Sequence, residues 1–341
     1  MNIQAENKVK KENAALEVWK RFRRNWVAMI GLFLVLFVAL LAIFAGVIRP
    51  ADPNFPGVPA YNMQGWFFGI PERSFPTAEF PFGTDNLGRC IFTRVIYGAR
   101  ISLIVGFVAV GIAAVIGIPL GAIAGFYGGV GDNIIMRLMD IILAMPTILL
   151  AIAIAAALGP GMMNVMLAVG IAWVPIYART VRALVLTVKE QEFVEASRSC
   201  GAGDGRLIRK HILPNCAAPL IVEATMGIAG AILMAAALSF IGIGIQSPTP
   251  EWGAMLAEGR GQMLAGYWFT TVFPGLFIAT MIISLNMIGD GLRDAFDPKL
   301  RGANFSKGRF RKIIRLRTKE NAILAETALA DGSAVKEAQD V

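Results

Sequence analysis

The chain has 341 residues, a length sufficient for two or three soluble domains, but its composition excludes them. Hydrophobic residues make up 56% of the chain and charged residues 16%, whereas about a quarter of a soluble globular chain is charged. The net charge of +8 comes from basic residues at both ends and in one central segment, beside apolar stretches. That placement is typical of membrane topology rather than of nucleic-acid binding. We therefore predict an all-α protein that crosses a membrane several times.

Six apolar segments are each long enough to cross a hydrocarbon core of about 30 Å. An even number of spans puts both basic ends on one side, together with the basic segment between the fourth and fifth spans. We therefore expect both termini and this segment in the cytoplasm. The predicted spans cover approximately residues 27–47, 103–124, 134–158, 165–186, 217–245 and 272–288.

These spans predict the order of parts along the chain. The final part, the basic tail, either lies as a helix on anionic lipid or is solvated, and the sequence leaves both open. The predicted parts are a cytoplasmic segment (1–25), a first transmembrane helix (26–48), an extracytoplasmic loop (49–100), a five-helix core (101–290) that includes a cytoplasmic loop at 190–215, and a cytoplasmic basic tail (291–341).

Two segments are expected on the outer side of the membrane. The loop 49–100 is polar and rich in proline and aromatic residues, which favours a structured loop over a linker. Residues 246–270 are typical of a short amphipathic helix on the outer surface, with Trp252 and Trp268 at the depth of the lipid headgroups. The three cysteines have no metal-binding or redox spacing, and no disulfide is predicted among Cys90, Cys200 and Cys216.

Two patterns within the predicted spans indicate how the helices pack. Gly117, Gly121 and Gly125 recur at every fourth position of the second span, which would let another helix approach closely. A kink is the alternative use of these glycines. In the third span, Arg137 and Asp140 lie three residues apart on one helix face and are expected to neutralise each other.

A polar, basic segment separates the fourth and fifth spans. The pattern of residues 192–215 predicts a helix, a glycine turn, and a second helix that Pro214 ends. The glycines lack the spacing and the Lys-Ser/Thr pair of a phosphate-binding loop, and His211 is the only histidine in the chain. No catalytic, cofactor-binding or metal site is therefore predicted. A helix pair without a core of its own is expected to be held by another protein.

The spacing within this segment resembles a known loop. Glu195-Ala196-Ser197, then Gly201, then His211-Ile212-Leu213-Pro214 is similar to the Glu-Ala-Ala loop of ABC importer permeases. Ser197 stands where the family has a second alanine, and His211 where many members have isoleucine; serine is small enough to keep the close packing. In that family the loop couples the permease to a cytoplasmic ATPase subunit. The resemblance therefore implies a coupling role for Glu195, Ala196, Ser197, Gly201, Leu213 and Pro214.

Further segments resemble the dipeptide, oligopeptide and nickel permeases, so that the resemblance covers roughly residues 20–302. One departure is Cys90, which stands where that subfamily usually has aspartate. The matching segments are Gly83–Arg89 continued by Tyr97–Leu103, Pro250–Gly253, and Gly289–Asp294 followed by Asp297-Pro298.

The resemblance implies the membrane-spanning subunit of an ATP-driven importer in a bacterial inner membrane, without enzyme activity, with peptides as the leading substrate class. Its implied partners are a second related permease, cytoplasmic ATPase subunits, an extracytoplasmic substrate-binding protein and the lipid bilayer. An ion-driven secondary transporter is the alternative, but it should show inverted repeats and several buried carboxylates at mid-span. A membrane anchor without transport would leave the central segment without a use.

Polar residues within the predicted spans are candidates for a hydrophilic translocation path. A charged side chain at the centre of a membrane helix costs about 2.5–3.5 kcal/mol, so it usually faces away from lipid. Hydrogen bonding between helices is the alternative, and we favour it for Asn286. The candidates are Glu223, Ser284 and Asn286.

Overall fold

The computed structural model describes residues 14–48, 74–78 and 80–297. Contacts divide the chain into two compact units, Met1–Arg293 and Asp294–Val341, and the fold described below is that of the first. The predicted basic tail beyond residue 297 and residues 49–73 of the predicted outer loop lie outside the described residues.

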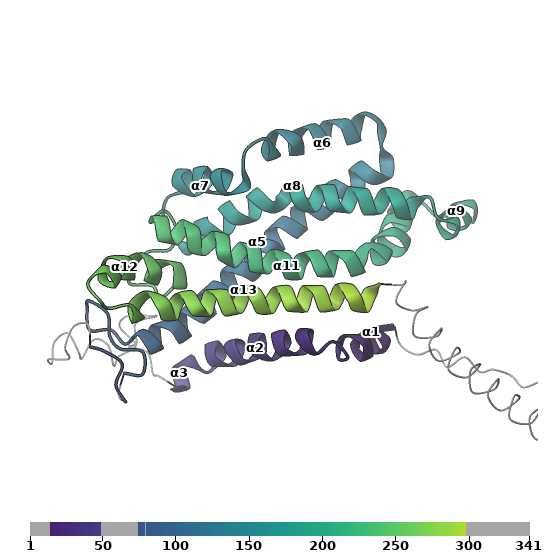
Figure 1. Cartoon of the computed structure of the whole chain (residues 1–341). Coiled ribbons are helices and arrows are strands. Elements are labelled where there is room, and N and C mark those ends of the chain that lie inside the picture. Colours follow the sequence, from purple (N-terminus) through teal and green to yellow (C-terminus); the bar gives the residue numbers. More distant parts are fainter. Residues whose placement is uncertain (1–13, 49–73, 79, 298–341) are drawn as a thin grey trace, which may run out of the picture. The chain divides into compact units, whose positions relative to one another are not determined.

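Long helices that lie side by side form the body of the first unit (Figure 1). They are α2 (Trp26–Ile43), α5 (Ile91–Tyr127), α8 (Met162–Lys189), α11 (Leu213–Ile241) and α13 (Phe269–Phe296). Figure 1 shows α12 (Trp252–Leu264) at one end of this bundle and α9 (Glu192–Ser199) at the other, and we call these the α12 end and the α9 end. Shorter helices complete the described part: α1 (Ala14–Phe22), α3 (Ala45–Ile48), α6 (Gly129–Leu143), α7 (Thr147–Leu158), α10 (Asp204–Arg206) and the π-helical turn η1 (Leu207–Ile212).

Length and hydropathy identify the helices that can cross a membrane. Five of the described helices qualify: α2, α5, α8, α13, and the continuous stretch Asp204–Ile241 that contains α11. A sixth span results when α6 and α7, which are bent by 85° at the break between them, are counted together. The count equals the six predicted spans only when this bent pair is taken as one span.

The third predicted span is therefore two helices rather than one. α6 ends at Leu143, and Pro146 precedes α7 in an extended conformation (φ −51°, ψ 130°). A proline disfavours helical geometry in the residue before it, here Met145, and it has no N–H to continue the helix. This chain therefore turns at a proline that hydropathy alone does not register as a break.

Ion pairs join α6 to α8 instead of neutralising charge within α6. Arg179 of α8 donates to Asp140 at 2.6 Å, so the predicted pairing of Asp140 with Arg137 is wrong. Arg182 of α8 holds Asp132 through two hydrogen bonds, from Nε at 2.5 Å and from Nη2 at 2.6 Å. The arginine reaches across to the next helix and binds both carboxylate oxygens with two N–H groups along one edge of its planar guanidinium.

The glycine face of the second span packs against α8, as predicted. A β-carbon at Gly117 would lie 2.7 Å from Tyr177 Cβ, and one at Gly125 would lie 2.9 Å from the carbonyl oxygen of Arg182. At Gly121 the added carbon would collide with the carbonyl oxygen of Ala178. Three successive turns of α5 thus approach the backbone of α8 so closely that only glycine fits.

α5 is much longer than the predicted span, which covered residues 103–124. It begins at Ile91, so the residues from 91 to 100 are helical rather than part of an outer loop. The buried side chain of Arg94 finds ion-pair partners outside the membrane-spanning helices, which lets a charged residue sit in this extension.

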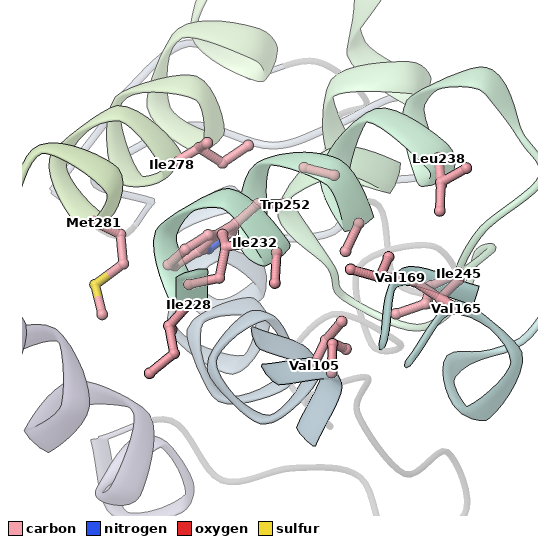
Figure 2. Packing of buried hydrophobic residues seen from close by; sticks show 14 of the residues in the cluster. Val105, Val165, Val169, Ile228, Ile232, Leu238, Ile245, Trp252, Ile278 and Met281 are labelled. Atoms are coloured by element: carbon pink, nitrogen blue, oxygen red, sulfur yellow. The ribbon is translucent and has the colours of Figure 1, made fainter. Parts of the chain in front are cut away.

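Trp252 lies in the core and not at headgroup depth as predicted. It is fully buried, and its indole N–H donates to the carbonyl oxygen of Val95 at 2.9 Å. Gly98 leaves room for the ring, because a β-carbon there would lie 3.0 Å from Trp252 Cδ1. Figure 2 shows Trp252 among Ile232 and the other apolar side chains that α5, α8, α11, α12 and α13 bring together. Trp268 is 47% exposed.

The α5–α8 contact predicts opposite outcomes for two substitutions on one helix. Gly121→Val should destabilise the protein by about 1–3 kcal/mol, because overpacking forces the backbones apart. Gly111→Val is the matched control, since a β-carbon at Gly111 meets no atom within 4 Å. Unfolding of the purified variants in detergent measures both. Equal losses of stability in the two variants would contradict this packing.

Candidate functional site

The segment between α8 and α11 is anchored on this chain's own helices. Val194, Leu207 and Ile212 are each 0–1% exposed. They belong to a small apolar core with residues of α5 and α8, namely Ala122, Phe126, Val181, Val185 and Val188. The expectation that this segment lacks a core is therefore wrong, because its apolar side chains are buried against the α9 end of the bundle.

Two polar contacts reinforce this anchorage. Lys189, the last residue of α8, donates from Nζ to the carbonyl oxygen of Gly125 in α5 at 3.0 Å. The guanidinium of Arg198 in α9 lies over the ring of Phe126, 5.8 Å from its centroid, in a cation–π contact. α9 is thus tied to the ends of both α5 and α8.

The predicted glycine turn follows α9. Gly201 has a φ of +82°, in the left-handed region where a side chain would be strained. The amide of Cys200 donates to the carbonyl oxygen of Ala196, and that of Gly201 donates to Arg198. This closing turn satisfies carbonyl groups that the end of a helix would leave free.

The outer face of α9 carries the predicted coupling residues. Glu195 and Ala196 are exposed. Ser197 is half-buried, and its hydroxyl donates to the carbonyl oxygen of Phe193 at 2.8 Å, so it needs no partner from another molecule. The exposed carboxylate of Glu195 is one of the charged groups that α9 presents to the surroundings, together with Glu192 and Arg198.

Shallow hollows lie on two sides of α9. One, of about 300 Å³, is lined by Lys189, Glu190, Val194, Glu195, Arg198 and Ser199. The other, of about 320 Å³, is lined by Ala196, Ser197, Cys200, Ala202, Arg206 and His211. A ridge that carries a carboxylate and is flanked by two hollows with basic side chains has the shape and charge to bind another protein.

Pro214 does not end the second helix of the segment, contrary to the prediction. The helix runs on from Asp204 to Ile241 through the π-helical turn η1, and Pro214 sits in the first turn of α11. Proline is tolerated in the first turn, and a wider turn accommodates its missing N–H. The side chain of Asn215 donates to the carbonyl oxygen of His211 at 2.6 Å. Leu213 is half-buried against the small apolar core, while Pro214 is exposed.

The three predicted path residues lie on two helices, α11 and α13. Glu223 is half-buried on α11, and Asn286 is half-buried on α13. Ser284 is 1% exposed and lies where α13 meets α2, since a β-carbon at Gly31 would be 2.7 Å from its carbonyl oxygen. The contacts of the described residues place Ser284 in a helix contact.

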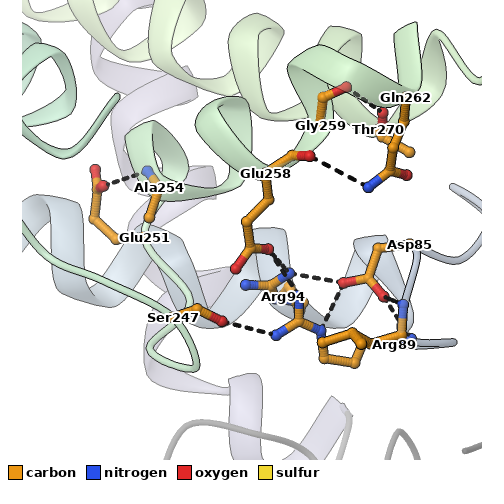
Figure 3. A network of polar contacts seen from close by, with 11 residues as sticks. Asp85, Arg89, Arg94, Ser247, Glu251, Ala254, Glu258, Gly259, Gln262 and Thr270 are labelled. Carbon is orange, nitrogen blue, oxygen red and sulfur yellow. Dashed lines mark hydrogen bonds and ion pairs between the residues drawn. The ribbon is translucent and has the colours of Figure 1, made fainter. Parts of the chain in front are cut away.

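Four charged side chains meet at the α12 end of the bundle (Figure 3). Arg89 Nε and Arg94 Nη1 both donate to Oδ2 of Asp85, at 2.6 and 2.8 Å. Arg89 Nη2 and Arg94 Nη1 both donate to Oε2 of Glu258, at 2.7 and 2.5 Å. We call these four residues the charged network. Two positive and two negative charges balance, as burial requires.

The charged network joins parts of the chain that are far apart in sequence. The other oxygen of Asp85 accepts the amides of Leu87 and Arg89, each at 2.9 Å, which closes a tight turn before α5. Arg89 Nη1 also donates to Ser247 at 3.2 Å. The network thereby joins the turn before α5 and the first turns of α5 to Ser247, in the segment between α11 and α12, and to α12 itself.

Asp85 and Arg89 belong to a segment that resembles the peptide permeases, but their ion pairs were not predicted from the sequence, and neither were those of Arg94 and Glu258. The sequence does contain one sign of this network: Arg94 lies within the apolar run of residues 91–103, and a buried charge needs a partner of opposite charge. Its partner Glu258 is 164 residues away, and only the folded chain brings the two together.

The pKa values of Glu251, which precedes α12, and of Glu258 within α12 are shifted in opposite directions. Burial opposes the charged form of Glu258, but the guanidiniums of Arg94 and Arg89 outweigh it and lower its pKa below 4.5. Burial raises the pKa of Glu251 above 4.5, although its carboxyl accepts the amide of Ala254 at 2.8 Å. The stabilisation from Glu258 is therefore present above pH 4.5 and lost as the pH falls through its lowered pKa. That from Glu251 is present at low pH and lost as the pH rises through its raised pKa.

These environments predict different effects for two isosteric changes. Glu258→Gln should lower the free energy of unfolding by about 3 kcal/mol near neutral pH, because two buried guanidiniums then share one carboxylate. Glu251→Gln should change it by less than about 1 kcal/mol, since an amide oxygen still accepts the Ala254 amide and no charge is buried. Unfolding of the purified variants at pH 7 measures the difference. Similar losses in both variants would refute the charged network as the stronger restraint.

Comparison with known proteins places this fold in a family. Residues 117–302 match the family model described as the inner membrane component of binding-protein-dependent transport systems. Residues 15–65 match the N-terminal transmembrane domain of oligopeptide transport permease C. The first match contains α8, α9 and α11, and the second contains α2.

Relatives with assigned names are similar over most of the chain. The dipeptide transport system permease protein DppC of Alkalihalophilus pseudofirmus is 47% identical over 288 residues, which cover 84% of this chain and 90% of the relative. DppC of Haemophilus influenzae is 46% identical over 84% of this chain and 95% of its own length. The glutathione transport system permease protein GsiD of Escherichia coli O157:H7 is 45% identical over 84% of this chain and 91% of its own length.

Among solved structures, a chain of the inward-facing MetNI methionine ABC transporter is similar with a TM-score of 0.49 and 19% identity. The match covers 60% of this chain and 97% of that chain. The family model, by contrast, matches more than half of the chain in sequence, and the relatives match over 84% of it. The chain is a multi-pass inner membrane protein and belongs to the family of binding-protein-dependent transport system inner membrane components.

Proposed function

We propose that this chain is the permease subunit of an ATP-driven importer for di- or oligopeptides. The observation that supports it most strongly is the identity of 45–47%, over 84% of the chain, to permeases named for dipeptide or glutathione transport. The chain itself would bind no nucleotide and catalyse no reaction. Its proposed partners are cytoplasmic ATPase subunits, a second related permease and an extracytoplasmic substrate-binding protein.

The exposed ridge of α9 is the proposed contact with the ATPase. Glu195 would pair with a basic side chain of that subunit, and Ala196 and Ser197 are small enough to let the ridge sit close against it. Gly201 supplies the left-handed turn that shapes the surface. Leu213 would act indirectly, because it packs on the small apolar core behind α9, and exposed Pro214 would complete the contact surface.

Movement of α9 would reach the far side of the bundle through α5. Val194 packs on Phe126 near one end of α5, and Arg94 lies in the charged network near the other end. The two residues of α5 are about 48 Å apart along a continuous helix, at about 1.5 Å per residue. α8 is locked to α5 by the glycine contact, so the two helices would move as one body when the importer changes its open side.

The translocation path itself is proposed to include Glu223 and Asn286, whose side chains are half-buried and so reach the surface of this subunit. A second permease facing that surface would complete the path. Ser284 is a weaker candidate, since it is buried in the contact between α13 and α2.

Uptake of a labelled dipeptide by cells that lack their own peptide permeases tests the function. Cells that express the complete transporter should accumulate the dipeptide, and ATP depletion should abolish the accumulation. Glu195→Lys should reduce uptake at least about tenfold, since reversal of a charge in a docked contact costs more than about 1.4 kcal/mol. Uptake that persists after ATP depletion but stops when the ion gradient is dissipated would instead identify an ion-driven transporter.

Asp204→Lys is the matched control for Glu195→Lys. Asp204 is also acidic and exposed, and it lies in the same segment, but it stands apart from α9 at the start of α10. This variant should keep most of the uptake, and both variants should reach the membrane in the amount of the parent protein. Full uptake by cells that carry Glu195→Lys would contradict the proposed coupling role of α9.

The proposed topology has both termini and α9 in the cytoplasm and the α12 end outside. The native Cys200 is exposed beside α9, while Cys90 and Cys216 are buried. A membrane-impermeant maleimide should therefore label the parent protein only after the cells are permeabilised. A Phe75→Cys variant, at a 56% exposed position before α5, should be labelled in intact cells. The reverse pattern would invert the topology.

A further inference from the structure

An apolar groove lies on the side of the bundle where α2 meets α5, near the α12 end. It has a volume of about 340 Å³. Ala39 and Ala42 of α2 contribute only methyl groups to its lining. The complete lining is Ala39, Ala42, Ile43, Arg100, Leu103 and Ile104.

Arg100 gives the groove its single charge. Its side chain is exposed, and none of the described residues supplies a carboxylate in contact with it. Arg94, by contrast, lies about 1.7 turns away on the same helix and binds two carboxylates. Among the described residues this cation has no carboxylate partner, and a cation in an otherwise apolar groove is complementary to an anion with an apolar tail.

The helix that forms the other wall faces lipid. Only 22% of α2 is buried, and its sequence contains no charged or polar side chain. Side chains that are about half exposed or more lie along its outward side, including Phe33, Leu36 and Leu40. The groove therefore opens onto the surface that contacts acyl chains.

The depth of Arg100 fits a headgroup. It lines the groove together with Ile43, which is the last residue of the membrane-spanning helix α2. An arginine this close to the end of a membrane helix extends its guanidinium to the phosphate layer while its methylene groups stay in the apolar region.

We propose that this groove binds a phospholipid, with an acyl chain between α2 and α5 and the phosphate group on the guanidinium of Arg100. The phosphate accepts hydrogen bonds from two N–H groups of arginine at once, which a lysine cannot reproduce. The ligand belongs to the membrane leaflet on the side of the α12 end. The lipid would fill the contact between the peripheral helix α2 and the rest of the bundle.

Photolabelling of the complete transporter in nanodiscs tests the proposal. The probe is phosphatidylglycerol with a diazirine on one acyl chain, diluted in phosphatidylethanolamine, and labelled peptides are mapped by mass spectrometry. Residues 39–43 and 100–104 should be labelled. Arg100→Gln should reduce that labelling about fivefold relative to the outward face of α2, the equivalent of about 1 kcal/mol for one basic residue.

Two further variants separate charge from shape. Ala39→Leu fills the groove and leaves Arg100 in place, so it should also reduce the labelling. Arg24→Gln removes an exposed arginine at the opposite end of α2 and should leave the labelling unchanged. Labelling by Arg100→Gln within twofold of the parent protein would overturn the proposal. So would a cross-link from Ile43→Cys to a second permease, because a protein would then occupy the groove.

Discussion

The contact between α5 and α8 is the constraint on which the rest of this protein depends. Gly117, Gly121 and Gly125 bring the two backbones so close that no β-carbon fits between them. In a membrane, helices gain little by burying apolar surface, so close backbone contact and dispersion hold them together. A pair packed in this way has few alternative arrangements, and it can transmit a displacement without bending.

Each end of this helix pair carries a different kind of fastening. At the α9 end, Val194, Leu207 and Ile212 attach the segment through a small apolar core. At the α12 end, the charged network attaches α12 and the turn before α5 through buried ion pairs. Apolar contacts tolerate small shifts, whereas a buried charge that loses its partner is strongly penalised. Breaking a contact at the α12 end therefore carries the larger penalty.

The helices of the bundle also differ in whether their exposed sides carry charged groups. α6 is joined to α8 by ion pairs such as Asp132 with Arg182, which would be expensive to expose to acyl chains. α2 has no such groups, and its contact with α5 leaves the groove beneath Arg100. The chain thus presents one helix with a purely apolar exterior and others whose charges need protein or water nearby.

The sequence by itself determined the membrane class, the glycine face of α5 and the position of the α9 segment. Each of these depends on local composition or on the helical repeat, which neighbouring residues specify completely. The position of Gly201 at the end of α9 belongs to the same group, because a break after a helical pattern requires a residue that tolerates positive φ.

Only the tertiary structure decided how these parts meet. Whether a proline ends a helix depends on its surroundings: Pro146 separates α6 from α7, whereas Pro214 lies in the first turn of a helix that continues. Trp252 leaves the surface because Gly98 and the carbonyl group of Val95 provide a slot for its ring. Arg94 finds Glu258 across 164 residues. Contacts at such distances follow from the packing of the whole chain, which no local pattern contains.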